Sequence, residues 1–193
     1  NTSTASFDES GQFTMSVKLN CVQTVRFTEI AGKNVVFAKN LVLEPGKKYY
    51  MVHDWKNGCC LFMGENARLQ NELMANPYDY PYVEANGNSN FLNVKALKKF
   101  KDEFLEKFSK TNDRLNEIIA QHPTISKRYR DYVSESNRFG AASAIFSTEI
   151  AAPNSRLPEE VEISARKLGT IDSTMPLSLT NDFARYINYL IIN

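Results

Sequence analysis

The sequence predicts an α+β protein in which an N-terminal antiparallel, sandwich-like β module precedes a C-terminal α-helical module. Apolar side chains alternate with a period of two before about residue 64, and they recur at three- and four-residue steps after residue 94. The intervening stretch holds the Pro and Gly residues typical of a linker. We therefore expect a β module ending in a short helix over residues 1–76, a linker over 77–90 and a helical module over 91–193.

Residues 12–19 show the clearest alternation in the N-terminal part. Successive side chains of a strand point to opposite faces of a sheet, so one apolar set is expected to share a buried face. This set consists of Phe13, Met15, Val17 and Leu19. The alternation predicts the first strand of the β module.

Further strands are expected where β-rich stretches are bounded by turn residues. They cover residues 22–28, 41–43, 48–53 and 59–63. Glu44-Pro45-Gly46 predicts a type II turn, because proline presets the first central residue and glycine supplies the positive φ of the second. Asn57-Gly58 is a strong signal for a hairpin. Short strands separated in this way are typical of a sandwich or an open barrel.

Helical periodicity begins with a short helix over residues 65–75 and continues in a long helix that starts at Val94 and is stopped by Pro123. The apolar stripe of the long helix is expected to comprise Val94, Leu97, Phe100, Phe104, Phe108, Leu115, Ile118 and Ile119. Ser126 is suited to cap a second helix running to about Ile150.

Two further helices are predicted near the end of the chain. Pro158, followed by two acidic residues, marks the start of the first, since proline and acids favour a helix N-terminus. The last helix covers about residues 180–192. Its inward side chains are expected to be Phe183, Tyr186, Ile187, Leu190 and Ile191.

The charge balance gives no sign of a polyanionic partner. The 23 basic and 22 acidic side chains leave a net charge of +1, whereas nucleic-acid binding needs a clustered basic surface. No run of 18 apolar residues exists, so no transmembrane segment is predicted. The first residues, Asn1 to Thr4, do not form a basic and apolar leader, so a signal peptide is either lacking or was removed before this numbering begins.

The cysteines and histidines do not predict a catalytic, cofactor-binding or metal-binding site. Cys59 and Cys60 are contiguous and would project to opposite faces of a strand, which suits neither a zinc site nor a redox CxxC pair. His53 and Asp54 are neighbours and would also point apart. His122 precedes a proline at a helix end. We expect structural roles for both histidines.

The tyrosines Tyr78, Tyr80 and Tyr82 are the candidate contacts for a ligand or partner in the predicted linker. Alternating tyrosines can stack on a sugar ring or on a protein surface. Packing of the loop against the core is the competing interpretation. These residues support an alternative function for the chain, as a binding module for glycans or peptides.

Two stretches carry a resemblance to a known family. Residues 41–54 contain Leu-Glu-Pro-Gly-Lys-Lys-Tyr, and residues 62–73 contain Gly-Glu-Asn-Ala-Arg-Leu-Gln-Asn-Glu-Leu. They resemble the N-terminal region of TlpA-like thioredoxin-family lipoproteins of Bacteroides-type bacteria. Residues 8–19 look like the first strand of that region, and residues 126–129 look like the start of its second long helix. The resemblance covers nearly the whole chain.

The resemblance implies a non-catalytic role. In that family the chemistry belongs to a C-terminal thioredoxin domain with W-C-x-x-C, whereas the only tryptophan here, Trp55, is followed by Lys56. A redox domain either follows Asn193 in a longer polypeptide or is absent. The resemblance therefore implies an accessory region of a cell-envelope or periplasmic thiol–disulfide oxidoreductase, lipid-anchored as a precursor. Its partner would be the thioredoxin-like domain or a client protein, and it would use no cofactor.

Overall fold

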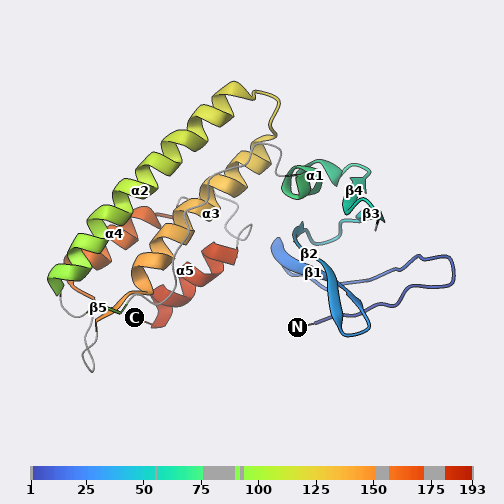
Figure 1. The fold of residues 1–193 in the computed structure, drawn as a ribbon, viewed down its shortest axis with the longest axis horizontal. Coiled ribbons are helices and arrows are strands. Elements are labelled where there is room, and N and C mark those ends of the chain that lie inside the picture. The colour runs from blue at the N-terminus through green and yellow to red at the C-terminus, as the bar shows by residue number, and fades with distance from the viewer. Residues whose placement is uncertain are drawn as a thin grey trace.

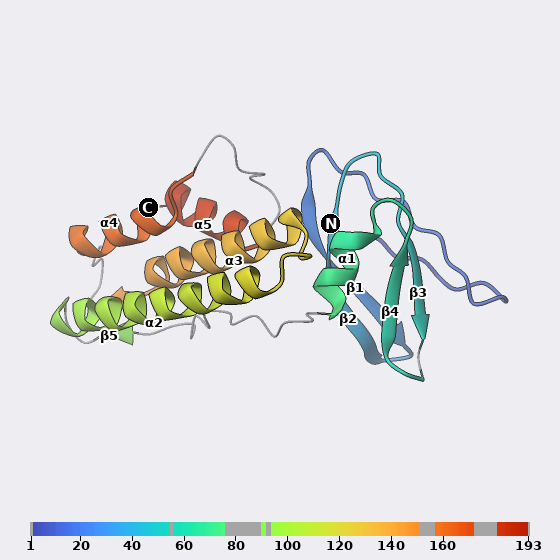
Figure 2. The same ribbon diagram turned by 90° about the horizontal axis from the view of Figure 1, so that it is seen from above.

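The computed structural model describes residues 2–54, 56–75, 90–91, 94–150, 157–171 and 181–192. In these residues the chain is α+β, as predicted, with two antiparallel hairpins near the N-terminus and five helices. The hairpins lie at one end of the molecule and the long helices at the other (Figures 1 and 2). Helix α1 (Ala67–Ala75) lies between the hairpins and the start of α3 (Lys127–Phe146).

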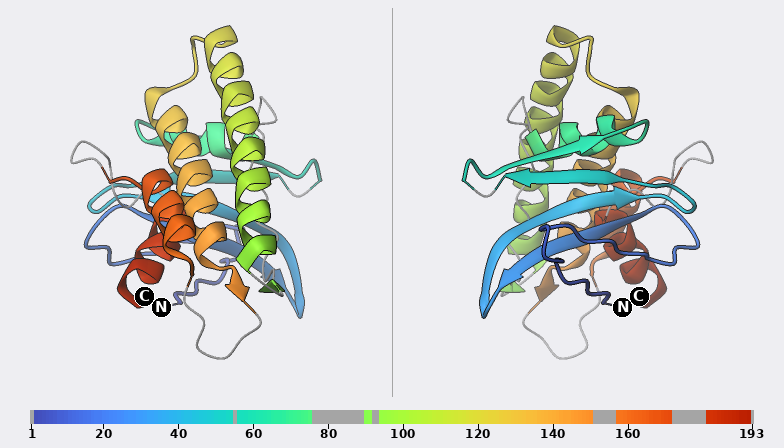
Figure 3. Two further views of the ribbon diagram at one scale, coloured as in Figure 1. Left: turned by 90° about the vertical axis from the view of Figure 1, so that its left-hand side faces the viewer. Right: turned by 90° about the vertical axis from the view of Figure 1, so that its right-hand side faces the viewer.

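The first hairpin pairs β1 (Gln23–Ala31) with β2 (Asn34–Leu43). The register shifts between Glu29 and Ile30, so a bulge interrupts the ladder there. The second hairpin pairs β3 (Tyr50–Asp54) with β4 (Cys59–Met63). Each hairpin is a separate two-stranded sheet, and the right-hand view of Figure 3 shows them above one another.

The glycine-based turns form as the sequence predicts. Gly46 has φ +71°, and the Lys47 N–H donates to the Glu44 carbonyl at 3.3 Å, which closes the turn before β3. Gly58 has φ +63° at the tip of the β3–β4 hairpin. A residue with a Cβ atom would be strained at these positive φ angles, so glycine is the residue that these turns require.

Residues 12–19 do not form the predicted strand. They run as extended chain without sheet pairing, and Met15 and Val17 are exposed rather than buried. Alternation supplies an apolar face but not the backbone partner that a strand needs, and no neighbouring strand bonds to this segment among the described residues. The prediction that these residues form a buried face is therefore wrong for this structure.

The remaining elements form the helical half. They are β5 (Asn90–Phe91), α2 (Val94–Gln121), α3, β6 (Glu149–Ile150), α4 (Glu159–Leu168) and α5 (Asn181–Ile192). Ser126 caps α3 as predicted, because its side chain accepts a hydrogen bond from the Tyr129 N–H. The prediction that α3 reaches Ile150 is wrong, since Thr148 donates through both N–H and Oγ1 to the Ile145 carbonyl and the chain then pairs in parallel with β5.

Two apolar clusters hold the helices. The first joins α2, α3, α4 and α5, and its largest buried side chains include Leu97, Phe139 and Ile145. The second includes Val42 of β2, Leu69 of α1 and Leu115 of α2, so it lies between the predicted β and helical modules. The predicted apolar stripes are wrong at two end positions: Val94 of α2 is 44% exposed, and Ile191 of α5 is 76% exposed.

Candidate functional site

The outer face of the β3–β4 hairpin is apolar and exposed. The register places Tyr50 opposite Met63 and Val52 opposite Leu61, so all four side chains lie on one face. Their exposed fractions are 60%, 48%, 51% and 55% in that order. We call these four residues the β3–β4 face. The largest apolar patch on a protein surface is often a functional one.

The β4 edge of this hairpin is held by α1. Phe62 is buried, and the Asn71 side chain bonds to both of its backbone groups: the Phe62 N–H donates to Oδ1 at 2.7 Å, and Nδ2 donates to the Phe62 carbonyl at 2.9 Å. This pair of bonds fixes β4 against the helix. The exposure of the β3–β4 face therefore belongs to a hairpin with an ordered, covered side.

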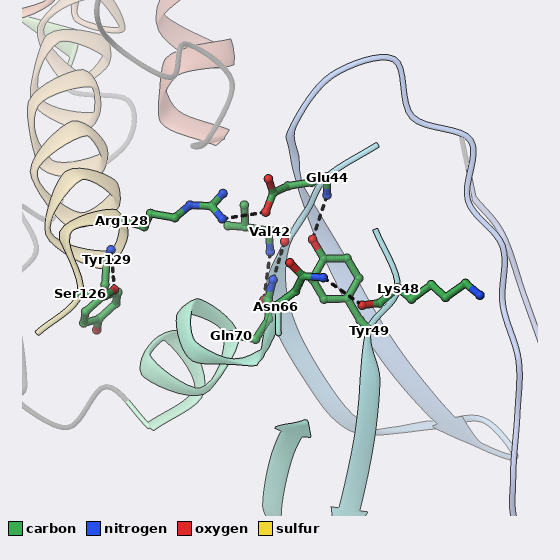
Figure 4. A network of polar contacts seen from close by, with 9 residues as sticks. All are labelled: Val42, Glu44, Lys48, Tyr49, Asn66, Gln70, Ser126, Arg128 and Tyr129. Carbon is green, nitrogen blue, oxygen red and sulfur yellow. Dashed lines mark hydrogen bonds and ion pairs between the residues drawn. The ribbon is translucent and has the colours of Figure 1, made fainter. Parts of the chain in front are cut away.

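Helix α1 also ties the second hairpin to the first. The Gln70 side chain accepts from the Val42 N–H at 3.3 Å and donates to the Val42 carbonyl. Asn66 Nδ2 donates to the carbonyl of Lys48 at 3.3 Å, in the turn that leads into β3 (Figure 4). These two amides and Asn71 lie within residues 62–73, and all three side chains bond to backbone groups.

We call the contacts that α1 and the residue before it make with the two hairpins the α1 junction. A third set of contacts joins this junction to α3. The Ser126 N–H donates to Glu72 at 2.9 Å, and the Ser126 hydroxyl donates to the other carboxylate oxygen. Arg128 forms an ion pair with Glu44 at 2.8 Å, beside the turn that precedes β3 (Figure 4). The Tyr49 hydroxyl accepts from the Glu44 N–H, and burial raises the pKa of that phenol.

A histidine–carboxylate pair lies between the hairpins. His53 Nδ1 of β3 is 2.9 Å from Glu29 Oε2 of β1, and the Phe37 ring lies 4.4 Å from the imidazole. The Glu29 side chain is 5% exposed, and its second oxygen has no hydrogen-bond partner among the described residues. Asp54 points elsewhere and accepts from Lys56 and Asn57, which lowers its pKa.

The register also places Cys60 directly opposite His53. Cys60 and His53 thus lie on paired strands and Glu29 reaches His53 from the other hairpin, a combination of residue types that some nucleophilic sites use. The chemistry does not match, because burial raises the pKa of the Cys60 thiol and so keeps it protonated at neutral pH. Cys59 lies exposed on the other face, and within the described residues no cluster of three candidate ligands could hold a metal ion.

The helical half contains two charged groups in buried positions. The Lys101 side chain is 7% exposed and bonds to Glu160 of α4 at 2.8 Å, which raises the pKa of the amine. Glu135 of α3 is buried, and its Oε2 has no hydrogen-bond partner in the part of the chain that the structure describes. Burial raises the pKa of Glu135 to about 7. The Lys101–Glu160 ion pair links α2 to α4.

The sequence-predicted contacts Tyr78, Tyr80 and Tyr82 lie outside the described residues. His122 lies at the end of α2, where its backbone N–H donates to the Ile118 carbonyl at 3.1 Å. Sequence reasoning missed the Glu29–His53 pair and the exposure of the β3–β4 face. For the face, a signal was available: residues 49–52 are apolar on both sides of the strand, which is typical of a strand covered twice.

Comparison with known proteins gives no further assignment. The chain matches no family model, and no curated protein or solved structure is significantly similar to it. In the described residues, no helix has the length and apolarity that crossing a membrane requires.

Proposed function

We propose that this chain is a non-catalytic accessory region of a cell-envelope thiol–disulfide oxidoreductase. Its β3–β4 face contacts the thioredoxin-like domain of the longer protein or the client of that domain. The observation that carries the proposal is the row of four exposed apolar side chains, Tyr50, Val52, Leu61 and Met63, on a hairpin whose other side is covered.

The size of the face favours a weak contact over a permanent one. Four side chains that are about half exposed offer on the order of 400 Å² of apolar area. A stable complex between separate proteins buries about 800 Å² per partner. An interface of half that size suits a transient client or a domain on the same polypeptide, for which tethering supplies an effective concentration in the millimolar range.

The chemistry of the hairpins also supports a role without catalysis. The one thiol close to a histidine, Cys60, has its pKa raised by burial, so thiol exchange would be slow at neutral pH. The polar residues of the α1 junction are occupied in bonds to backbone and to caps. These residues hold the β3–β4 face in place and leave the chemistry to another domain.

Binding can be tested with a thioredoxin-like domain that carries W-C-x-x-C, added in trans to the isotopically labelled chain. We expect amide shifts confined to β3 and β4, with affinity in the high micromolar to millimolar range. Leu61→Lys should abolish them, because it places a charge in the centre of the apolar face. Thr28→Lys, an exposed substitution on β1, is the matched control and should leave them unchanged. Shifts elsewhere, or shifts that survive Leu61→Lys, would contradict the proposal.

Catalysis can be tested on the chain alone. A thiol–disulfide exchange assay should show turnover at the background level, and Cys60→Ser should not change it. Turnover clearly above background that disappears in Cys60→Ser would overturn the non-catalytic assignment.

A further inference from the structure

The unpaired segment over residues 12–19 retains the properties of a strand. Its backbone from residue 13 to residue 19 makes no hydrogen bond to another backbone group among the described residues. Met15 and Val17 are 36% and 41% exposed, although the alternation marks them as one apolar face. An extended segment with unbonded backbone and an exposed apolar face gains stability wherever a sheet edge accepts it.

The segment begins at a well-formed turn. The Asp8 carboxylate accepts from the N–H groups of Ser10 and Gln12, both at 2.9 Å, and the Gly11 N–H donates to the Asp8 carbonyl at 3.0 Å. The Ser10 hydroxyl also donates to the Asp8 carboxylate, at 2.7 Å, and this bond together with those from the Gln12 and Ser10 N–H groups lowers the pKa of the Asp8 carboxyl. The chain therefore reverses direction at a defined point and runs back toward β1 (Figure 1).

One side chain of the segment already contacts the first hairpin. The Phe13 ring stacks on Phe27 of β1 at 5.9 Å, and Phe27 in turn contacts Phe37 of β2 at 6.1 Å. Phe27 belongs to the same face of β1 as the buried Glu29. In the described part of the chain, β2 is the strand that pairs with β1.

The Phe13–Phe27 contact defines a register for that third strand. If these two residues face each other in an antiparallel pair, Met15 lies opposite Val25 and Val17 lies opposite Gln23. The apolar side chains of the segment then fall on the side of Phe27 and Val25, and its polar side chains face outward. The connecting loop comprises residues 18–22, a length that hairpins commonly use.

We propose that residues 13–17 form a third strand of the β1–β2 sheet, closing on β1 in this register. Closure covers the edge of β1 and buries Met15 and Val17. The proposal concerns the β1 edge and does not depend on the β3–β4 face.

Disulfide trapping tests the register. In a background with Cys21→Ser, Cys59→Ser and Cys60→Ser, the pair Met15→Cys and Val25→Cys should form an intramolecular bond at least ten-fold faster than Met15→Cys with Arg26→Cys. Arg26 is adjacent in sequence but points to the opposite face of β1. Equal rates for the two pairs, or a bond formed only between two chains, would overturn the proposal.

A second measurement uses the unmodified chain, in case the cysteine-free background folds poorly. Alternate amides between residues 13 and 17 should exchange with solvent at least ten-fold more slowly than in an unstructured peptide, because a third strand bonds every second N–H to β1. Exchange of all these amides at the unstructured rate would refute closure.

Discussion

Glu135 offers the sharpest test of the helical half, because its carboxyl group is buried without a full set of partners. Burial raises its pKa from 4.5 to about 7, and Arg138 and Lys127 only partly offset this effect. The folded-state pKa lies above the unfolded one, so the stability that the neutral carboxyl confers is complete below pH 4.5. It is lost as the pH rises through about 7, where the buried group must ionise.

The size of the effect follows from the shift in pKa. Each unit corresponds to 1.36 kcal/mol, so a rise from 4.5 to about 7 gives an upper limit of about 3 kcal/mol. Solvent near the neighbouring charges screens the group, and we expect about 1 to 2 kcal/mol. Glu135→Gln removes the titration and keeps the shape. Its free energy of unfolding relative to wild type should therefore increase by this amount between pH 5 and pH 8.

Urea denaturation at several pH values measures this difference. The quantity to compare is the difference in free energy of unfolding between Glu135→Gln and wild type, followed as a function of pH. Its change with pH is informative because the new amide could itself cost stability at every pH. Glu103→Gln, at an exposed ion pair with Lys99, is the matched control and should show no such change. A wild type and Glu135→Gln variant that lose or gain stability in parallel from pH 5 to pH 8 would refute the argument.

Three further substitutions test the packing and the α1 junction by urea denaturation. Leu115→Ala removes a fully buried side chain from the cluster between the two halves and should lower the free energy of unfolding by about 2 to 5 kcal/mol. A loss below about 1 kcal/mol would contradict this packing. Asn71→Ala leaves two Phe62 backbone groups without their partner and should cost about 2 kcal/mol, whereas an unchanged midpoint would show that the bonds are not formed in solution. Ser126→Ala removes the α3 cap and its bond to Glu72 and should cost about 1 kcal/mol, with Ser164→Ala on the exposed side of α4 as a near-neutral control.

The features that the sequence predicts correctly are those decided by neighbouring residues. The turns at Gly46 and Gly58 need only local backbone chemistry, and the Ser126 cap needs only the first turn of its own helix. The helix stripes follow from spacing along one element. The predicted stripes fail at Val94 and Ile191 because they assume that neighbouring elements cover each helix as far as its terminal turn.

The features that it misses depend on where distant segments meet. Glu29 and His53 are 24 residues apart, and only the packing of two hairpins brings them to 2.9 Å. The burial of Glu135 depends on how closely α3 is surrounded by other elements. Residues 12–19 have the pattern of a strand, but pairing requires an edge that pattern alone cannot supply.

The arrangement of the junction bears directly on how the β3–β4 face would work. A small interface gains affinity when it is presented without loss of conformational freedom. Asn71 bonds β4 to α1, and Glu72 bonds α1 to the start of α3. The β3–β4 face is therefore connected to the helical half through two sets of hydrogen bonds. Glu72→Gln weakens the hydrogen bonds between α1 and Ser126 but lies outside the β3–β4 face. If orientation matters for partner binding, this variant should bind more weakly while the β3 and β4 amides keep their own chemical shifts, whereas unchanged binding would mean that the hairpin acts alone.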